Sequence, residues 1–234
     1  MDTTKNRLQA VKSRIEAACA ACGRDARDIV LVAVSKGQSA EAIREAFAAG
    51  QRGFGESYVQ EALGKMRELA DLPIVWHFIG PIQSNKTRPV AESFDWVHSV
   101  DRLKIAERLS AQRPAERGPL NVCVQVNVSG EASKSGVAPE EAVALAKAVA
   151  ALPRLALRGL MTIPEPTPDQ ALTRRRFETL AGIRAQLRAE GLPLDTLSMG
   201  MSDDFELAVA TGSTMVRIGT AIFGPRAKRA AAPQ

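Results

Sequence analysis

The stretch Ile-Val-Leu-Val-Ala-Val-Ser-Lys-Gly, residues 29–37, decides how this chain folds. Six apolar residues in a row are typical of a parallel strand that is buried on both faces. The run stops at a Ser-Lys-Gly turn. A helix is expected to follow, with Ser39 as its N-cap and an end near Ala49, where Gly50 closes it. The stretch therefore predicts one strand–turn–helix unit.

The same alternation of strand and helix continues along the chain. Seven further strands are expected at 53–55, 74–79, 96–100, 121–128, 157–163, 196–199 and 215–218. The helices that follow them are expected at 57–70, 84–91, 102–111 (opened by Asp101), 139–151, 169–190 and 203–210, with a last helical turn at 220–223. An extra helix over about residues 3–22 precedes the first strand.

Eight strand–helix units predict an α/β protein, a single (β/α)8 TIM-type barrel with an extra N-terminal helix. No linker separates a second domain, so residues 1–234 are expected to form one domain, with a frayed tail at about 227–234. An open doubly wound sheet is the alternative. Its dinucleotide-binding version is disfavoured because no G-x-G-x-x-G opens a helix after a strand.

The composition excludes several classes of protein. Apolar residues make up 45 % of the 234 residues, which is enough for a large core and excludes disorder. Aromatic residues make up only 4 %, which argues against a stacking surface for nucleic acid. The net charge of +5 is partly concentrated at 174–176 and in the tail. A solvated helix face and a frayed terminus explain these charges better than nucleic-acid binding does.

Cys19 and Cys22 form a C-x-x-C motif, which can indicate a redox or zinc site. No second such pair follows, and a closed zinc site needs four ligands. The helical spacing instead places Cys22 on one face with Val11 and Ile15, so both cysteines are expected to pack as small apolar side chains. No metal site is predicted.

The N-terminus has no apolar segment typical of a signal peptide, and no run approaches 18 apolar residues. The chain is therefore expected to be cytoplasmic, without contact to a membrane.

Lys36 is the sharpest candidate for chemistry, because a barrel carries its active site at the carboxyl ends of its strands. Partial desolvation at the end of an apolar strand favours the neutral amine, which can attack an aldehyde and form a Schiff base. The alternative is a lysine whose ammonium group reaches past the rim to solvent. The strand by itself leaves both open.

The turns after the last two strands form a candidate anion site. Loops seven and eight of such barrels frequently bind phosphate. Gly219 lets the backbone approach an anion closely, while Ser202 and Thr220 add hydroxyl donors. Ordinary helix capping is the alternative. Arg217, in the strand beside Gly219, needs an acceptor if it is buried: a carboxylate or the ring nitrogen of a pyridine cofactor.

Taken together, these motifs resemble those of the pyridoxal phosphate homeostasis proteins, which are related to the barrel domain of alanine racemase. The resemblance runs from about residue 29 to residue 226 and is carried by the segments 32–36, 53–56, 76–80, 83–86, 133–136, 159–163, 198–204 and 216–224.

The resemblance implies that the cofactor is pyridoxal 5'-phosphate and that Lys36 is its Schiff-base lysine. It implies that Ser202, Gly219 and Thr220 hold the phosphate, and that Arg217 faces the pyridine nitrogen. An arginine at that nitrogen weakens the ring as an electron sink and disfavours strong carbanion chemistry.

Three further residues complete the candidate cofactor-binding set: Ser57, His77 and Ser198, each at or just after the end of a strand. Ser57 stands where the family usually has Asn, and its shorter side chain is expected to reach the cofactor's 3-hydroxyl only through a water. The family also implies a secondary or transfer role for Lys134.

The resemblance favours a non-enzymatic carrier or buffer in pyridoxal phosphate homeostasis, a monomer that can deliver the cofactor to apo-enzymes. A pyridoxal-phosphate-dependent amino-acid racemase is the alternative, and it needs an acid–base group on each face of the substrate carbon. Tyr58 is the sole tyrosine, and His77 is as well suited to orienting a neighbour. A Schiff-base aldolase acting on a sugar phosphate is a weaker third hypothesis.

Overall fold

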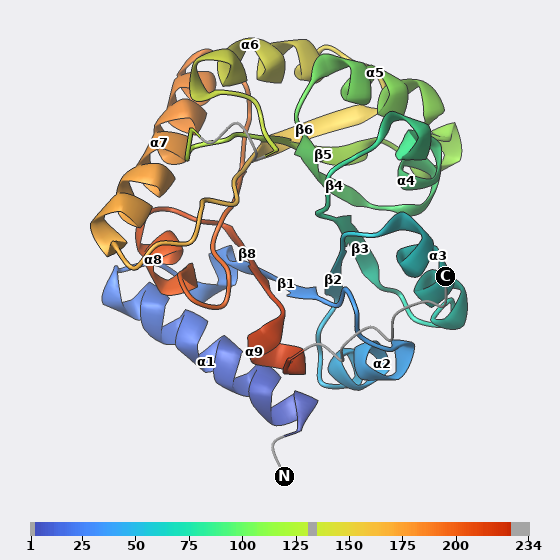
Figure 1. Cartoon of the computed structure of the whole chain (residues 1–234), viewed down its shortest axis with the longest axis vertical. Helices are drawn as coiled ribbons and strands as arrows, with labels where there is room; N and C mark the ends of the chain where they lie inside the picture. Colours follow the sequence, from blue (N-terminus) through green and yellow to red (C-terminus); the bar gives the residue numbers. More distant parts are fainter. Residues whose placement is uncertain (1–2, 131–134, 226–234) are drawn as a thin grey trace, which may run out of the picture.

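In a computed structural model of the chain, the eight strands form a closed parallel barrel in the order β1 to β8, with β8 pairing back onto β1. Figure 1 shows the helices arranged around it. The structure describes residues 3–130 and 135–225. The predicted (β/α)8 barrel with its extra N-terminal helix is confirmed. Lys134 and the tail 227–234 lie outside the described residues.

The strands are short. They are β1 Val30–Val34, β2 Gly53–Glu56, β3 Val75–Phe78, β4 Trp96–Val100, β5 Leu120–Gln125, β6 Leu155–Met161, β7 Thr196–Ser198 and β8 Met215–Ile218. The helices are α1 Thr4–Ala21, α2 Ala40–Ala48, α3 Val59–Glu68, α4 Thr87–Ser93, α5 Leu103–Gln112, α6 Pro139–Ala150, α7 Gln170–Ala189, α8 Phe205–Ala210 and α9 Thr220–Phe223.

The helix starts follow the capping residues in most places. The side chain of Ser39 accepts a hydrogen bond from an amide in the first turn of α2, and Asp169 does the same for α7. The expectation that Asp101 caps α5 was wrong. The N-cap residue is Arg102, and its side chain makes no cap hydrogen bond. Asp101 lies one residue before it, and its carboxylate pairs with the Arg102 guanidinium.

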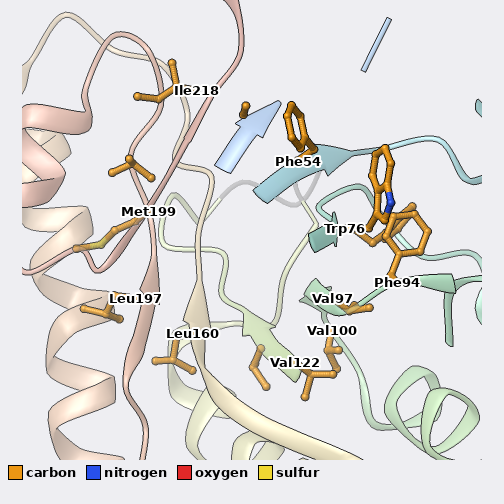
Figure 2. Packing of buried hydrophobic residues seen from close by; sticks show 14 of the residues in the cluster. Phe54, Trp76, Phe94, Val97, Val100, Val122, Leu160, Leu197, Met199 and Ile218 are labelled. Carbon is orange, nitrogen blue, oxygen red and sulfur yellow. The ribbon is translucent and has the colours of Figure 1, made fainter. Parts of the chain in front are cut away.

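The apolar core lies between the barrel wall and the helices. Figure 2 shows Phe54, Trp76 and Phe94 gathered at one side of this layer. The ring centroids of Phe54 and Trp76 lie 6.3 Å apart, and Phe54 and Phe94 are fully buried. Each large side chain buried in this way contributes roughly 1.5–3 kcal/mol of transfer free energy.

The barrel interior is polar at the level of its carboxyl half. His98 on β4 hydrogen-bonds to Ser198 on β7 with a nitrogen–oxygen distance of 2.8 Å. These strands are not neighbours in the barrel, so the contact crosses its interior. Side chains alternate between the two faces of a strand, which is why apolar side chains cover the outside while polar ones meet within.

The extra helix α1 packs beside α8 and α9, outside the barrel (Figure 1). Its buried face includes Val11, Ile15 and Cys19. Cys19 packs in the core as expected, but Cys22 is exposed. The helix ends at Ala21, so the helical spacing that placed Cys22 on the buried face does not reach it.

Among the described residues, no helix is both long and apolar enough to cross a membrane.

Candidate functional site

A cavity of about 220 Å³ opens at the carboxyl ends of the strands. Its lining comes mainly from the turns after β1, β7 and β8 and comprises Val34, Lys36, Gln38, Ile79, Ile163, Met201, Ser202, Asp203, Arg217, Gly219, Thr220 and Gly224. Five of the eight predicted site residues are among them. Because β1 and β8 are neighbours in the closed barrel, residues 36 and 219 meet although they are far apart in the sequence.

Lys36 lines the cavity and is half-buried. It occupies a tight turn in which the Gln38 amide donates to the Ser35 carbonyl at 2.9 Å. Gly37 has φ +74°, a left-handed conformation that glycine adopts without strain. Val34 and Lys36 both line the cavity, as alternate residues of an extended segment should. The turn therefore presents an amine to the cavity.

Ser202 and Thr220 line the same cavity, from the turns after β7 and β8. Within the described part of the chain, neither hydroxyl has a hydrogen-bond partner, so both can donate to a ligand. Gly219 precedes α9 directly, and a Cβ on it would lie 3.1 Å from the Val34 carbonyl oxygen. This packing leaves little room for a side chain. The first amides of any helix lack intrahelical acceptors, so this end is rich in donors.

Arg217, on β8, also lines the cavity. It is 3 % exposed. One guanidinium nitrogen, Nη1, donates to Ser198 Oγ at 2.6 Å, and Nη2 donates to the Thr162 carbonyl at 2.8 Å. Burial lowers the pKa of Arg217 to about 10, although Asp204 opposes the shift. At neutral pH the guanidinium therefore stays charged and is held in a fixed orientation.

Two histidines extend this network beneath the cavity. His77 Nδ1 lies 3.0 Å from His98 Nε2, and His98 Nδ1 lies 2.8 Å from Ser198 Oγ. Burial lowers the pKa of His77 to about 3. The pKa of His98 is also lowered, by burial first and then by His77 and Arg217. Both rings are therefore neutral at physiological pH, and they form a polar chain that ends on Arg217.

His77 and Ser198 do not line the cavity; the structure places them one layer below it. Both residues can act on a ligand only through Arg217. Ser57 also lies off the lining. Its backbone packs on Gly80, where a Cβ would come within 2.4 Å of the Ser57 carbonyl oxygen.

Sequence reasoning missed the side walls of the cavity. Ile79 and Ile163 are apolar lining residues that just follow the ends of β3 and β6. Their signal was available, because they come directly after buried strands. Apolar residues at strand ends are common in any barrel, so the pattern by itself does not distinguish cavity walls from core. A cavity lined by apolar side chains as well as by donors and an amine suits a flat, largely apolar ring.

Comparison with known proteins places this geometry in a family. A sequence profile described as the alanine racemase N-terminal domain matches residues 7–227. The chain is 62 % identical over 226 residues to the pyridoxal phosphate homeostasis protein of Pseudomonas aeruginosa, and the match covers 97 % of both chains. It is 54 % identical over 232 residues to the protein of that name from Escherichia coli, covering 97 % of this chain and 98 % of that one.

The chain belongs to the pyridoxal phosphate homeostasis protein family.

Solved structures agree with this family assignment. PipY of Synechococcus elongatus, in a structure with pyridoxal phosphate bound, is 39 % identical with a TM-score of 0.83, and the match covers 95 % of this chain and all of that one. An alanine racemase of Clostridium difficile has a TM-score of 0.77 at 15 % identity, and the match covers 56 % of its length. At that identity the comparison shows that the two proteins have the same barrel fold and nothing more.

Proposed function

We propose that this protein binds pyridoxal 5'-phosphate as a Schiff base on Lys36 and serves as a carrier or buffer in intracellular pyridoxal phosphate homeostasis. The observation that carries the proposal is the cavity itself. It brings together an amine-bearing side chain, two hydroxyls without a hydrogen-bond partner in the described structure, and a fixed cation. Family members named for this role, and PipY with the cofactor bound, support it.

The residues fit the chemical groups of the cofactor. When bound, the cofactor supplies an aldehyde that condenses reversibly with an amine. Ser202, Gly219 and Thr220 would hold its phosphate, and Arg217 would face its ring nitrogen. Because Arg217 stays charged, it would donate to that nitrogen and leave it unprotonated. This arrangement favours holding the cofactor over using it for carbanion chemistry.

The test is reduction of the purified, cofactor-loaded protein with borohydride, followed by peptide mapping. The mass of the reduced cofactor is expected on Lys36. A sugar-phosphate aldolase would give no such adduct, and loss of the visible absorbance without any mass on Lys36 would refute the assignment.

An amino-acid racemase is the second candidate, since racemases share this fold. A racemase needs a second acid–base group facing the substrate. Neither Tyr58, which is 54 % exposed, nor the buried His77 lines the cavity. Neither residue that the sequence offered for that role is therefore placed to act on a bound substrate, and Asp203 is the acidic side chain in the described lining. Incubation with L- and D-alanine separates the two hypotheses, because turnover at enzymic rates would exclude a pure carrier.

The same proposal includes the setting of the protein. We place it in the cytoplasm as a monomer, with pyridoxal-phosphate-dependent apo-enzymes as recipients and neither nucleic acid nor membrane as a partner. Size-exclusion chromatography with light scattering tests the oligomeric state.

A further inference from the structure

A cluster of buried charges lies behind Lys36, on the helix-facing side of the barrel wall. Glu56, the last residue of β2, is fully buried, and Lys65 on α3 is 6 % exposed. The Lys65 ammonium donates to Glu56 Oε1 at 2.7 Å and to Glu61 Oε1 at 2.6 Å. One cation thus joins two carboxylates in the layer between the barrel wall and the helices, where the apolar core lies.

This cluster holds the backbone on both sides of Lys36. Before it, the Lys65 ammonium donates to the carbonyl of Ser35 at 2.8 Å, and Ser35 Oγ donates to Glu56 Oε1 at 2.6 Å. After it, the amide of Gly37 donates to Glu61 Oε1 at 2.5 Å. The three contacts reach both neighbours of Lys36, so they fix the turn from which its side chain projects.

The direction of the side chain follows from alternation along the strand. Ser35 points outward to Glu56, whereas Val34 and Lys36 line the cavity. If Ser35 rotated away from Glu56, the extended segment would turn with it and carry the Lys36 side chain away from the cavity. The outward contacts of Ser35, together with the hydrogen bond from its amide to the Gly55 carbonyl at 2.9 Å, therefore hold the segment that turns Lys36 toward the cavity.

Stability does not account for the cluster. Glu56 Oε2 is buried and makes no hydrogen bond in the described structure. Burial raises the pKa of Glu56, and the nearby Lys65 and Ser35 offset this only in part. Replacing a buried ion pair by apolar residues of similar volume is often neutral or stabilising. A costly cluster placed behind one functional lysine is better explained by orientation.

We propose that Glu56, Lys65 and Glu61 act as positioning residues that aim the Lys36 amine for condensation. The inference rests on the proposed function, in which Lys36 Nζ bonds to the aldehyde carbon and the aldehyde oxygen leaves as water. The cluster touches neither the cavity nor the reacting atoms. It acts through the turn at residues 35–37.

The test is the double variant Glu56→Leu/Lys65→Met, which removes both buried charges and keeps the side-chain volumes similar. The rate at which the borohydride-trapped adduct forms on Lys36 is expected to fall roughly 10- to 100-fold, because a small misplacement of a reacting group slows a reaction by about that factor. Affinity for pyridoxine 5'-phosphate, which has an alcohol in place of the aldehyde, is expected to stay within about twofold, since it uses only the ring and phosphate contacts.

A matched control is Arg44→Met/Asp71→Leu, which removes an exposed ion pair between α2 and the segment after α3. It is expected to change neither quantity. An unchanged trapping rate in the Glu56/Lys65 variant would overturn the inference. An equal loss of trapping and of pyridoxine 5'-phosphate affinity would also overturn it, because the cluster would then support the whole site. Wild-type protein that traps nothing would instead refute the proposed function.

If the double variant does not fold, Glu56→Gln provides the second measurement. The amide keeps a hydrogen-bonding oxygen but removes the charge that holds Lys65. Trapping is expected to slow by about threefold or more with unchanged pyridoxine 5'-phosphate affinity, since a hydrogen bond to a charged group is worth more than a neutral one. A wild-type trapping rate in this variant would overturn the inference equally.

Discussion

Two groups of cavity residues are supported in different ways: Lys36, the amine end, and the turns that bear Ser202 and Thr220, the donor end. Behind Lys36 lies a cluster of buried charges whose hydrogen bonds are 2.5–2.8 Å long. The donor end is supported from outside by α1, which Figure 1 shows beside α8 and α9. Arg14 pairs with Glu206 at 2.6 Å, and Arg7 Nε donates to the Ile222 carbonyl at 2.8 Å.

The difference matches what each end would do in the proposed function. An atom that forms a covalent bond must be aimed, and buried contacts in a medium of low dielectric constant hold a group firmly. A phosphate accepts hydrogen bonds from several donors, so a small shift of one loop loses only part of its binding. The Arg14–Glu206 pair, with both side chains more than 40 % exposed, contributes correspondingly less.

The largest expected effect is at the amine end. Lys36→Ala should abolish the borohydride-trapped adduct, because no other side chain with a primary amine lines the described cavity. Pyridoxine 5'-phosphate should still bind, since its phosphate and ring contacts remain. Lys104→Ala, an exposed lysine on α5, is the control and should trap normally. An unchanged visible spectrum in Lys36→Ala would remove that lysine from the site.

Substitution of Arg217 tests whether its guanidinium takes part in cofactor binding. Arg217→Ala should weaken retention of pyridoxal phosphate by about 10- to 100-fold, as expected for losing a hydrogen bond from a charged group worth roughly 1.5–3 kcal/mol. Equilibrium dialysis of the folded variant measures it. Arg113→Ala removes another buried arginine, one that bonds to backbone carbonyls far from the cavity, and should leave retention unchanged. Equal retention in both variants would exclude Arg217.

The histidines beneath the cavity give a pH effect on stability. The pKa of His77 is about 3 in the folded protein and near 6.5 when unfolded, so between these values the unfolded chain binds more protons. The free energy of unfolding should therefore fall by about 1.4 kcal/mol per pH unit for this residue below pH 6.5.

Urea titrations of the wild type and His77→Gln at pH 7 and pH 5 isolate this contribution. Raised carboxyl pKa values such as that of Glu56 act in both proteins and cancel in the difference. The loss of stability on acidification should be smaller in His77→Gln. Identical losses would contradict a neutral, buried His77.

The smallest expected effect is at the contact between α1 and the donor end. Arg14→Met should weaken pyridoxal phosphate binding by at most about fivefold, because an exposed ion pair is worth up to about 1 kcal/mol. Binding of pyridoxal, which lacks the phosphate, should not change. Arg88→Met removes an exposed pair on α4 and serves as the control. A loss as large as the fall in trapping expected for Glu56→Leu/Lys65→Met would mean that the two ends depend equally on their supports.

The sequence by itself determined the barrel and the position of its site. Continuous apolar runs alternating with capped helices left few topologies that bury every strand. Closure of the barrel then brings the last strand beside the first. For this reason the sequence assigns Lys36 and Gly219 to one cavity.

The tertiary structure decided which neighbouring residue faces which side. Strands of three to five residues that are buried on both faces show no clear polar–apolar alternation, so the pattern did not say that Glu56 points outward or that His77 and Ser198 lie below the cavity. Those directions depend on contacts between distant segments, such as Lys65 with Ser35. Local sequence preferences carry no information about such pairs, because they arise only when the chain packs.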